Sequence, residues 1–197
     1  ELVNFEHSIV LTNENFRFIV KEQLHNAEAI NSAIIIEPEA KNTAPAILAA
    51  SLFAFRQNKD SVLLVSPSDH ILINKEAFHE AIKEGISEVL RGQIVTFGIP
   101  PKYPETGYGY LELSNSSSSH TAKVLKFVEK PNKEKANEFI KKGNYLWNAG
   151  IFLFRAKDII DAFNIYCKEI VENVSDALNN GTSDLGFFRM EKTSWAK

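Results

Sequence analysis

Short apolar runs and amphipathic stretches take turns along the first half of the chain. Four runs rich in Val, Ile and Leu predict strands, at residues 8–11, 33–36, 62–65 and 93–98. Three stretches between them repeat apolar residues at the spacing of one helix face, at residues 16–25, 44–57 and 74–90. Strand, helix, strand in this order predicts right-handed βαβ units, hence an α/β protein with a mainly parallel sheet flanked by helices. The unbroken apolar run at 62–65 is typical of a strand buried on both faces of such a sheet.

The rhythm changes after residue 98. Residues 100–110 hold three prolines and two glycines and cannot form a helix. Two short runs that follow, 111–113 and 123–128, predict a small antiparallel insertion, joined by the serine-rich hairpin tip 114–119. The remaining pattern predicts a helix over 132–142 between Asn132 and Gly143, a strand at 151–154 and one long helix over 156–178. The tail to Lys197 shows no clear element.

Composition narrows the class of protein. A chain of 197 residues can bury the core of one domain, which we expect to span residues 1–197. The net charge of −3 without a basic cluster argues against nucleic acid as a partner. The single cysteine, Cys167, excludes an internal disulfide, fits a reducing compartment and falls in a helical pattern, where packing is its expected role. No apolar run reaches the length of a membrane span, so we expect a cytoplasmic protein that does not bind membranes.

Ser68 and Asp69 stand directly after the strand predicted at 62–65, beyond Pro67. In open α/β sheets, ligands bind outside the carboxyl ends of the strands. A carboxylate at that place commonly holds a divalent cation that neutralises phosphate oxygens. The residues alone leave open that Asp69 only caps the next turn.

A second candidate is the polar loop that precedes the helix predicted from Ala44. Asn42 or Thr43 suits the N-cap position, and Pro45 suits the first turn, where a missing N–H costs nothing. The loop leaves backbone donors and two polar side chains at a strand-to-helix junction, which can hold an anion or recognise a nucleobase. A helix start without a ligand remains the other interpretation.

Polar residues near the antiparallel insertion form a third group. Glycines alternate with tyrosines in residues 107–110, which allows a ligand to approach the bare backbone at Gly109. Glu129 and Lys130 end a predicted strand, and Pro131 forces a turn that brings both side chains to one cavity. A carboxylate can accept from vicinal hydroxyls and an ammonium can meet a phosphate, although an exposed Glu-Lys pair is often only solvated. Asn148 lies between Trp147 and Gly150, in what reads as a binding rim.

Six short motifs in the same order resemble bacterial mannose-1-phosphate guanylyltransferases, also called GDP-mannose pyrophosphorylases. They are Glu37-Pro38 with Asn42-Thr43-Ala44-Pro45-Ala46, Pro67-Ser68-Asp69-His70, Thr96-Phe97-Gly98-Ile99, Pro104-Glu105-Thr106-Gly107-Tyr108-Gly109-Tyr110, Phe127-Val128-Glu129-Lys130-Pro131 and Tyr145-Leu146-Trp147-Asn148-Ala149-Gly150-Ile151-Phe152. The resemblance covers most of the chain and implies a Rossmann-like nucleotidyltransferase fold. It also implies the reaction of GTP with mannose 1-phosphate, with Mg2+, to give GDP-mannose and pyrophosphate.

The resemblance also implies roles for individual residues. Asp69 would be a catalytic metal ligand near the α-phosphate, and Asn42, Thr43 and Ser68 would line the nucleotide side. The sugar phosphate would be held by Gly109, Glu129, Lys130 and Asn148, with Lys130 as the catalytic cation. The partners implied are GTP and mannose 1-phosphate, and a homodimer stays open.

The chain also departs from the family pattern. The glycine-rich signature that cradles the triphosphate and the later acidic segment that supplies a second metal ligand are both absent from these residues, and Lys41 and Ala149 replace the usual Arg and Ser. We therefore expect a partial nucleotidyltransferase domain, from a processed or longer protein, with little activity by itself. The alternatives are a non-catalytic remnant that binds sugar nucleotide, a sugar-phosphate nucleotidylyltransferase that uses another base, or an α/β domain without a ligand.

Overall fold

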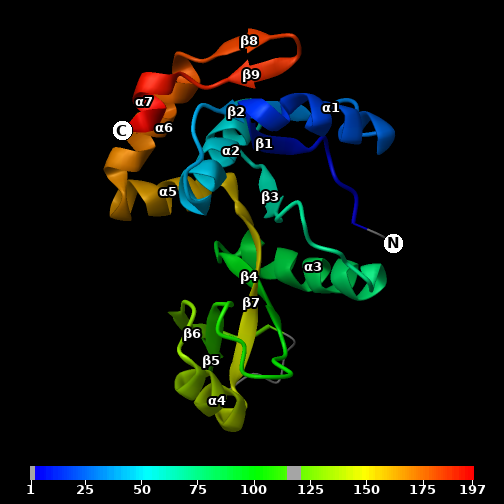
Figure 1. Ribbon diagram of the computed structural model, residues 1–197, viewed down its shortest axis with the longest axis vertical. Helices are drawn as coiled ribbons and strands as arrows, with labels where there is room; N and C mark the ends of the chain where they lie inside the picture. Colours follow the sequence, from blue (N-terminus) through cyan, green and yellow to red (C-terminus); the bar gives the residue numbers. More distant parts are fainter. Residues whose placement is uncertain (1–2, 115–120) are drawn as a thin grey trace. The chain divides into compact units, whose positions relative to one another are not determined.

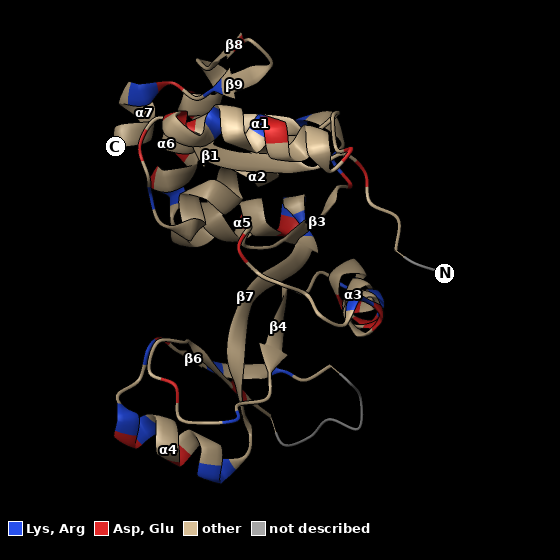
Figure 2. Ribbon diagram, turned by 45° about the vertical axis from the view of Figure 1, so that its right-hand side comes forward, with Lys and Arg blue, Asp and Glu red and all other residues tan. Residues whose placement is uncertain are grey.

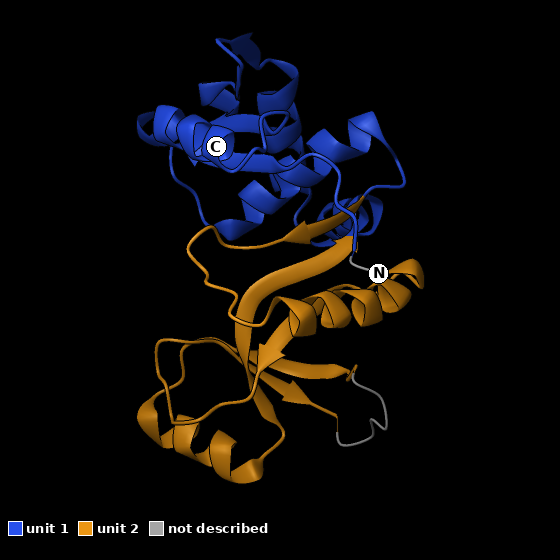
Figure 3. Cartoon of the chain, turned by 90° about the vertical axis from the view of Figure 1, so that its right-hand side faces the viewer, with its two compact units in different colours: residues 1–61, 155–197 blue, residues 62–154 orange. Residues whose placement is uncertain are grey.

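The computed structural model describes residues 3–114 and 121–197. The chain forms two compact units, shown in different colours in Figure 3. Unit 1 combines Glu1–Ser61 with Arg155–Lys197, and unit 2 is Val62–Phe154. The prediction of a single domain over residues 1–197 stays a prediction. No helix in the described part of the chain is long and apolar enough to cross a membrane.

Unit 1 is built on a four-stranded sheet with the order β1-β2-β9-β8. Its strands are β1 (Ile9–Asn13), β2 (Ala33–Glu37), β8 (Thr182–Asp184) and β9 (Phe187–Arg189). β2 pairs in parallel with both β1 and β9, whereas β8 and β9 form an antiparallel hairpin. The helices are η1 (Glu14–Phe16), α1 (Arg17–Asn26), α2 (Thr43–Gln57), α5 (Ala156–Tyr166), α6 (Lys168–Asn179) and α7 (Lys192–Ala196).

Both faces of this sheet are covered, as the alternation of side chains along β2 shows. Ile35 packs with Leu48 of α2 and with apolar residues of α5, α6 and α7. Its neighbours Ile34 and Ile36 point to the other face, where Val20 and Leu24 of α1 pack against them. The elements α1, α2 and β2 are labelled in Figure 1. Burial on two faces explains why the apolar run of β2 is continuous.

Unit 2 contains a five-stranded sheet in which β7 is the central member. Its strands are β3 (Val62–Val65), β4 (Val95–Ile99), β5 (Tyr110–Leu113), β6 (Val124–Val128) and β7 (Tyr145–Arg155). The strand order is β3-β7-β5-β6, and β4 also pairs with β7. β4 and β5 both run antiparallel to β7, and β5 runs antiparallel to β6. The predicted α/β class, with a parallel sheet flanked by helices, is confirmed by the parallel pairing of β2 with β1 and β9 in unit 1. The antiparallel insertion, in unit 2, is larger than expected.

Two helices cover the sheet of unit 2, and both carry acidic and basic residues along their length (Figure 2). On α3 (Lys75–Leu90), a Cβ placed on Gly85 would lie 3.1 Å from Leu153 Cδ2 of β7, so the backbone packs closely there. On α4 (Lys133–Lys142), Phe139 stacks on Tyr145 with ring centroids 4.1 Å apart. Asn132 caps α4 by accepting from Lys135 N, and Gly143 ends it in the left-handed conformation, as predicted.

Several strand predictions need correction. The run 62–65 was expected to be buried in a parallel sheet, but β3 lies at the end of the strand order in unit 2 and none of its residues is buried. The run 93–98 forms β4, which pairs antiparallel with β7 and not with a parallel neighbour. The strand expected at 151–154 begins at Tyr145, so the rim around Asn148 is part of β7. Short apolar runs identify strands but do not specify their partners.

The C-terminal part of the chain also differs from the prediction. The helix expected over 156–178 is two helices, α5 and α6, separated at Cys167, whose thiol is exposed and does not pack in a helix. The tail, in which the sequence shows no clear element, forms the β8–β9 hairpin and α7. The hairpin turn uses Leu185 and Gly186, both at positive φ. The predicted hairpin tip at 114–119 lies outside the described residues, apart from Ser114.

Candidate functional site

Three neighbouring strands of unit 2 bring the predicted sugar-phosphate residues together. The pairing of Tyr110 with Val128 in the β5–β6 ladder places Gly109 beside Glu129. A Cβ on Gly109 would lie 2.8 Å from Phe127 Cζ and 3.0 Å from Glu129 Oε2. A side chain at this position would enter the space that Phe127 and Glu129 occupy, so both of their side-chain ends would have to shift.

Asn148 joins this group from β7. Its backbone N–H donates to the carbonyl of Gly109 over 2.8 Å. Its side-chain Oδ1 lies 3.0 Å from Thr96 Oγ1 of β4. Gly109 therefore lies between Asn148 of β7, which donates to its carbonyl, and Glu129, which follows β6.

Glu129 and Lys130 form an ion pair across 3.4 Å, and their side chains are 58% and 65% exposed. Neighbouring residues of a strand point to opposite faces, so this contact requires a turn. Lys130 has φ +41, in the left-handed region that non-glycine residues rarely adopt, and Pro131 behind it is buried. The predicted turn at Pro131 is confirmed. A pair this exposed contributes little to stability, which leaves both groups open to a ligand.

The loop before β5 is held by contacts of its own. The Glu105 carboxylate accepts from the N–H groups of Thr106 and Gly107, each over 2.8 Å, and Tyr110 donates its hydroxyl to the Glu105 carbonyl over 2.8 Å. The rings of Tyr103 and Tyr108 lie edge-on to Trp147, with centroids 5.0 and 5.4 Å away. These contacts fix the path of the chain into Gly109.

The turn after β3 carries Ser68 and Asp69, and both are exposed. Within the described ranges, no hydrogen bond or ion pair engages the Asp69 carboxylate. Pro67, at the start of the turn, lies 3.6 Å from where a Cβ on Gly150 would be, and Gly150 has φ +69. The turn therefore begins beside Gly150 of β7, which is two positions after Asn148 in the sequence.

The Asp69 carboxylate is the group that could bind Mg2+ in this turn. Among residues 3–114 and 121–197, no group of three or more His, Cys, Asp or Glu side chains could hold a metal ion. Mg2+ usually keeps several waters and binds through one or two carboxylates plus substrate phosphates. A single open carboxylate fits an ion that takes most of its ligands from the substrate.

In unit 1, the predicted nucleotide loop leads into α2. Asn42 is the N-cap residue but its side chain makes no capping hydrogen bond, and both Asn42 and Thr43 are at least partly exposed. The start of α2 was predicted correctly to within a residue. The amide of Asn42 is therefore not used to cap the helix.

The C-terminal segment, which the sequence pattern missed, holds this loop in place. Lys41 Nζ donates to the Ala196 carbonyl over 3.0 Å, and the indole of the buried Trp195 donates to the Glu39 carbonyl over 2.9 Å. Glu191 caps α7 through the N–H groups of Thr193 and Ser194, and these bonds lower its carboxyl pKa to about 2. The sequence pattern gave no signal for this role, because the contacts join residues more than 150 positions apart.

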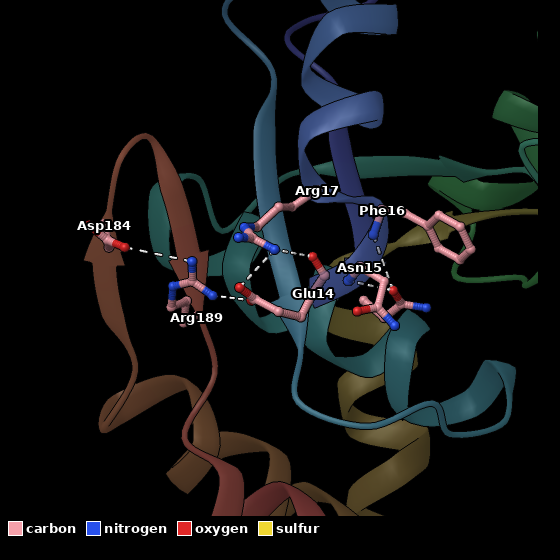
Figure 4. Close-up of polar contacts among 7 residues, drawn as sticks. Glu14, Asn15, Phe16, Arg17, Asp184 and Arg189 are labelled. Carbon is pink, nitrogen blue, oxygen red and sulfur yellow. Dashed lines mark hydrogen bonds and ion pairs between the residues drawn. The ribbon is translucent and has the colours of Figure 1, made fainter.

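Charged residues gather at the carboxyl ends of the parallel strands of unit 1. Glu14, directly after β1, forms ion pairs with Arg17 and with Arg189 at the end of β9, and Arg189 also reaches Asp184 over 3.6 Å (Figure 4). At the end of β2, burial raises the pKa of Glu37. The network connects β9 with the segment after β1, at the same sheet edge from which the loop with Asn42 and Thr43 departs.

Comparison with known proteins gives a family match over almost the whole chain. The sequence profile described as nucleotidyl transferase matches residues 2–196. Mannose-1-phosphate guanylyltransferase of Escherichia coli is 42% identical over 174 residues, which cover 87% of this chain and 37% of the relative. The protein of the same name from Escherichia coli K12 is 39% identical over 98% of this chain and 42% of its own length. Xanthan biosynthesis protein XanB of Xanthomonas campestris is 40% identical over 95% and 40%. The chain thus spans about two fifths of these curated relatives.

Solved structures show the same fold. A crystal structure named mannose-6-phosphate isomerase from Helicobacter pylori superposes with a TM-score of 0.83 at 30% identity, covering 96% of this chain and 73% of that one. A structure named mannose-1-phosphate geranyltransferase from Thermus thermophilus gives 0.77 at 27% identity, covering 95% and 51%. With the family match, these likenesses confirm the predicted nucleotidyltransferase fold.

Proposed function

Because the chain belongs to the nucleotidyl transferase family, we propose that it serves the reaction of a mannose-1-phosphate guanylyltransferase. In that reaction GMP passes from GTP to mannose 1-phosphate, and GDP-mannose and pyrophosphate are formed. The named relatives support this substrate pair, and the XanB relative supports a role in supplying polysaccharide synthesis. GTP supply and the single exposed cysteine favour the cytoplasm as the place of action.

One observation carries the proposal: Gly109, Glu129 and Asn148 converge from three strands of unit 2. The Glu129 carboxylate can accept from two vicinal sugar hydroxyls, and the bare backbone at Gly109 admits a sugar ring beside it. The Lys130 side chain is 65% exposed, so its ammonium can turn from Glu129 toward a phosphate. A carboxylate for hydroxyls and an ammonium for a phosphate match a sugar phosphate better than an uncharged sugar.

The chain's residues contribute to the transfer by positioning and by neutralising charge. A phosphate oxygen of mannose 1-phosphate attacks the α-phosphorus of GTP, the bond to the β-phosphate oxygen breaks, and pyrophosphate leaves. Negative charges approach each other in this step, so an orienting cation such as Lys130 lowers the barrier without covalent chemistry. Asp69 would hold Mg2+, which when bound would neutralise phosphate oxygens. No activated side-chain nucleophile is required.

For the nucleoside, unit 1 offers Asn42 and Thr43, and unit 2 separately offers Ser68. A side-chain amide can donate to and accept from a purine edge, and the Asn42 amide makes no capping bond that would compete. All three residues are exposed. Comparing the thermal shifts given by GTP, UTP and CTP with Mg2+ tests the base: GTP should raise the melting temperature most. Equal shifts, or a larger one with UTP, would point instead to another sugar-phosphate nucleotidylyltransferase.

Calorimetry with GDP-mannose, beside an assay for released pyrophosphate, tests the whole proposal. We expect GDP-mannose to bind and turnover to be weak, because the chain has no glycine-rich phosphate loop among its residues. Asn148→Ala and Glu129→Gln should weaken binding, whereas Asn137→Ala on the exposed side of α4 is a matched control that should not. Sedimentation of the same samples tests the open prediction of a homodimer. No binding of GDP-mannose or mannose 1-phosphate at millimolar concentration would contradict the proposed function.

A further inference from the structure

A bulge in the β4–β7 ladder lies at Asn148. Thr96 pairs with Phe152, and the next paired position, Gly98, is opposite Asn148. Two steps along β4 therefore correspond to four along β7, so β7 holds extra residues there, and Gly150 among them has φ +69. Bulges interrupt the ladder and redirect the side chains beside them.

The Thr96 hydroxyl spans this bulge. Its Oγ1 lies 3.0 Å from Asn148 Oδ1 and 3.2 Å from the carbonyl of Ile151, and both Thr96 and Asn148 are partly buried. One hydroxyl connects a side chain before the bulge with a backbone carbonyl within it. No other described residue makes a side-chain hydrogen bond to the Asn148 amide.

We propose that Thr96 is a positioning residue that turns the donor end of the Asn148 amide toward the sugar phosphate. A carboxamide has an acceptor oxygen at one end and an NH2 donor at the other. With Oδ1 engaged by Thr96, Nδ2 and its two hydrogens are directed away from Thr96 and remain available. Phosphate and hydroxyl oxygens accept hydrogen bonds, so the NH2 end is the one that suits this ligand. This inference rests on the proposed function for the identity of the ligand.

The competing arrangement has a defined chemistry. A threonine hydroxyl carries one hydrogen, so it can donate to the Ile151 carbonyl and accept from Asn148 through a lone pair. The amide would then be reversed and would present its oxygen, which repels a phosphate. In that case Thr96 would only stabilise the bulge.

The test compares Thr96→Val, which keeps the shape but removes the hydroxyl, with Thr96→Ser, which keeps the hydroxyl. Calorimetry with mannose 1-phosphate and with GDP-mannose should show affinity lowered about five- to tenfold by Thr96→Val, the effect of one hydrogen bond, and largely restored in Thr96→Ser. In the Asn148→Ala background, Thr96→Val should have almost no further effect. An equal loss in both backgrounds, or none in either, would overturn the proposal.

A ligand-free measurement separates this inference from the proposed function. The side-chain NH2 signals of Asn148 in an NMR spectrum should move in Thr96→Val and stay in place in Thr96→Ser. If the wild-type chain binds neither ligand, the proposed function fails and these signals still decide whether Thr96 holds the amide. Unchanged Asn148 signals in Thr96→Val would overturn the positioning role even if both ligands bind.

Discussion

The two units of this chain hold their candidate residues by different means. In unit 2, Gly109, Glu129 and Asn148 are fixed by the pairing of neighbouring antiparallel strands. In unit 1, the loop with Asn42 and Thr43 depends on contacts from the end of the chain, Trp195 to Glu39 and Lys41 to Ala196. Strand register places a side chain through many backbone bonds, whereas each of the two tertiary hydrogen bonds depends on a single side chain and can be removed by one substitution. The loop with Asn42 and Thr43 should therefore be the more easily disturbed of the two groups.

The largest expected effect is that of Trp195→Ala. Removing a buried Trp should lower the free energy of unfolding of the chain by about 3–5 kcal/mol, measured by urea denaturation. Backbone amides of residues 39–42 should also lose protection from hydrogen exchange, because Glu39 loses its partner. Trp195→Phe keeps most of the apolar volume and should lower the free energy of unfolding by less. Because Phe has no N–H to donate to the Glu39 carbonyl, residues 39–42 should still lose protection. Unchanged protection at residues 39–42 in both variants would show that the tail does not position the loop.

Gly109→Ala tests whether strand pairing in unit 2 fixes the position of Glu129. The added methyl would meet Phe127 and Glu129 at 3.0 Å or less, so the Glu129 carboxylate must move. Affinity for mannose 1-phosphate should fall about tenfold or more by calorimetry, a change of roughly 1.4 kcal/mol. Gly107→Ala is the control: its methyl would lie 3.3 Å from the Glu105 carboxylate, a milder contact. Equal effects of the two variants would contradict the special place of Gly109.

A pH titration addresses the cap of α7. The folded-state pKa of Glu191 is lowered from 4.5 to about 2, so its contribution to stability is present above pH 4.5 and is lost as the pH falls toward 2. We expect Trp195 fluorescence, followed in a Trp147→Phe background, to change in that window. Glu191→Gln should remove this dependence. The same titration curve in Glu191→Gln would assign the change to another group.

The smallest effect is expected for the ion pairs around Glu14. Arg189→Met should cost about 1 kcal/mol or less, because both partners are partly exposed and screened by salt. The loss should shrink further at high ionic strength. Lys83→Met, which removes the exposed pair with Glu80 on α3, is the control and should cost still less. A loss of several kcal/mol that does not depend on salt would mean that the network is structural for the sheet edge.

Much of the site followed from local sequence, and each success has a local cause. Asn132 and Gly143 delimit α4 because capping and left-handed termination depend on neighbouring backbone alone. The turn after Glu129 followed from Pro131 in the same way. Burial alternates along β7 from Tyr145 onward, but Leu146 and Phe152 are apolar at half-buried positions, so the residues alone do not show period two. Thr96 could not, because its partners are 52 and 55 residues away.

By itself, the sequence determined the α/β class, the ends of most helices and the residue types offered to a ligand, since these depend on periodicity and local capping. Only the tertiary structure decided that 62–65 and 93–98 join the sheet of β7. It also decided that the helical pattern over 156–178 breaks at Cys167, and that Trp195 of the tail donates a hydrogen bond to the Glu39 carbonyl before Asn42. An apolar run buries itself against whatever surface the rest of the chain supplies, and that choice is made by contacts distant in sequence.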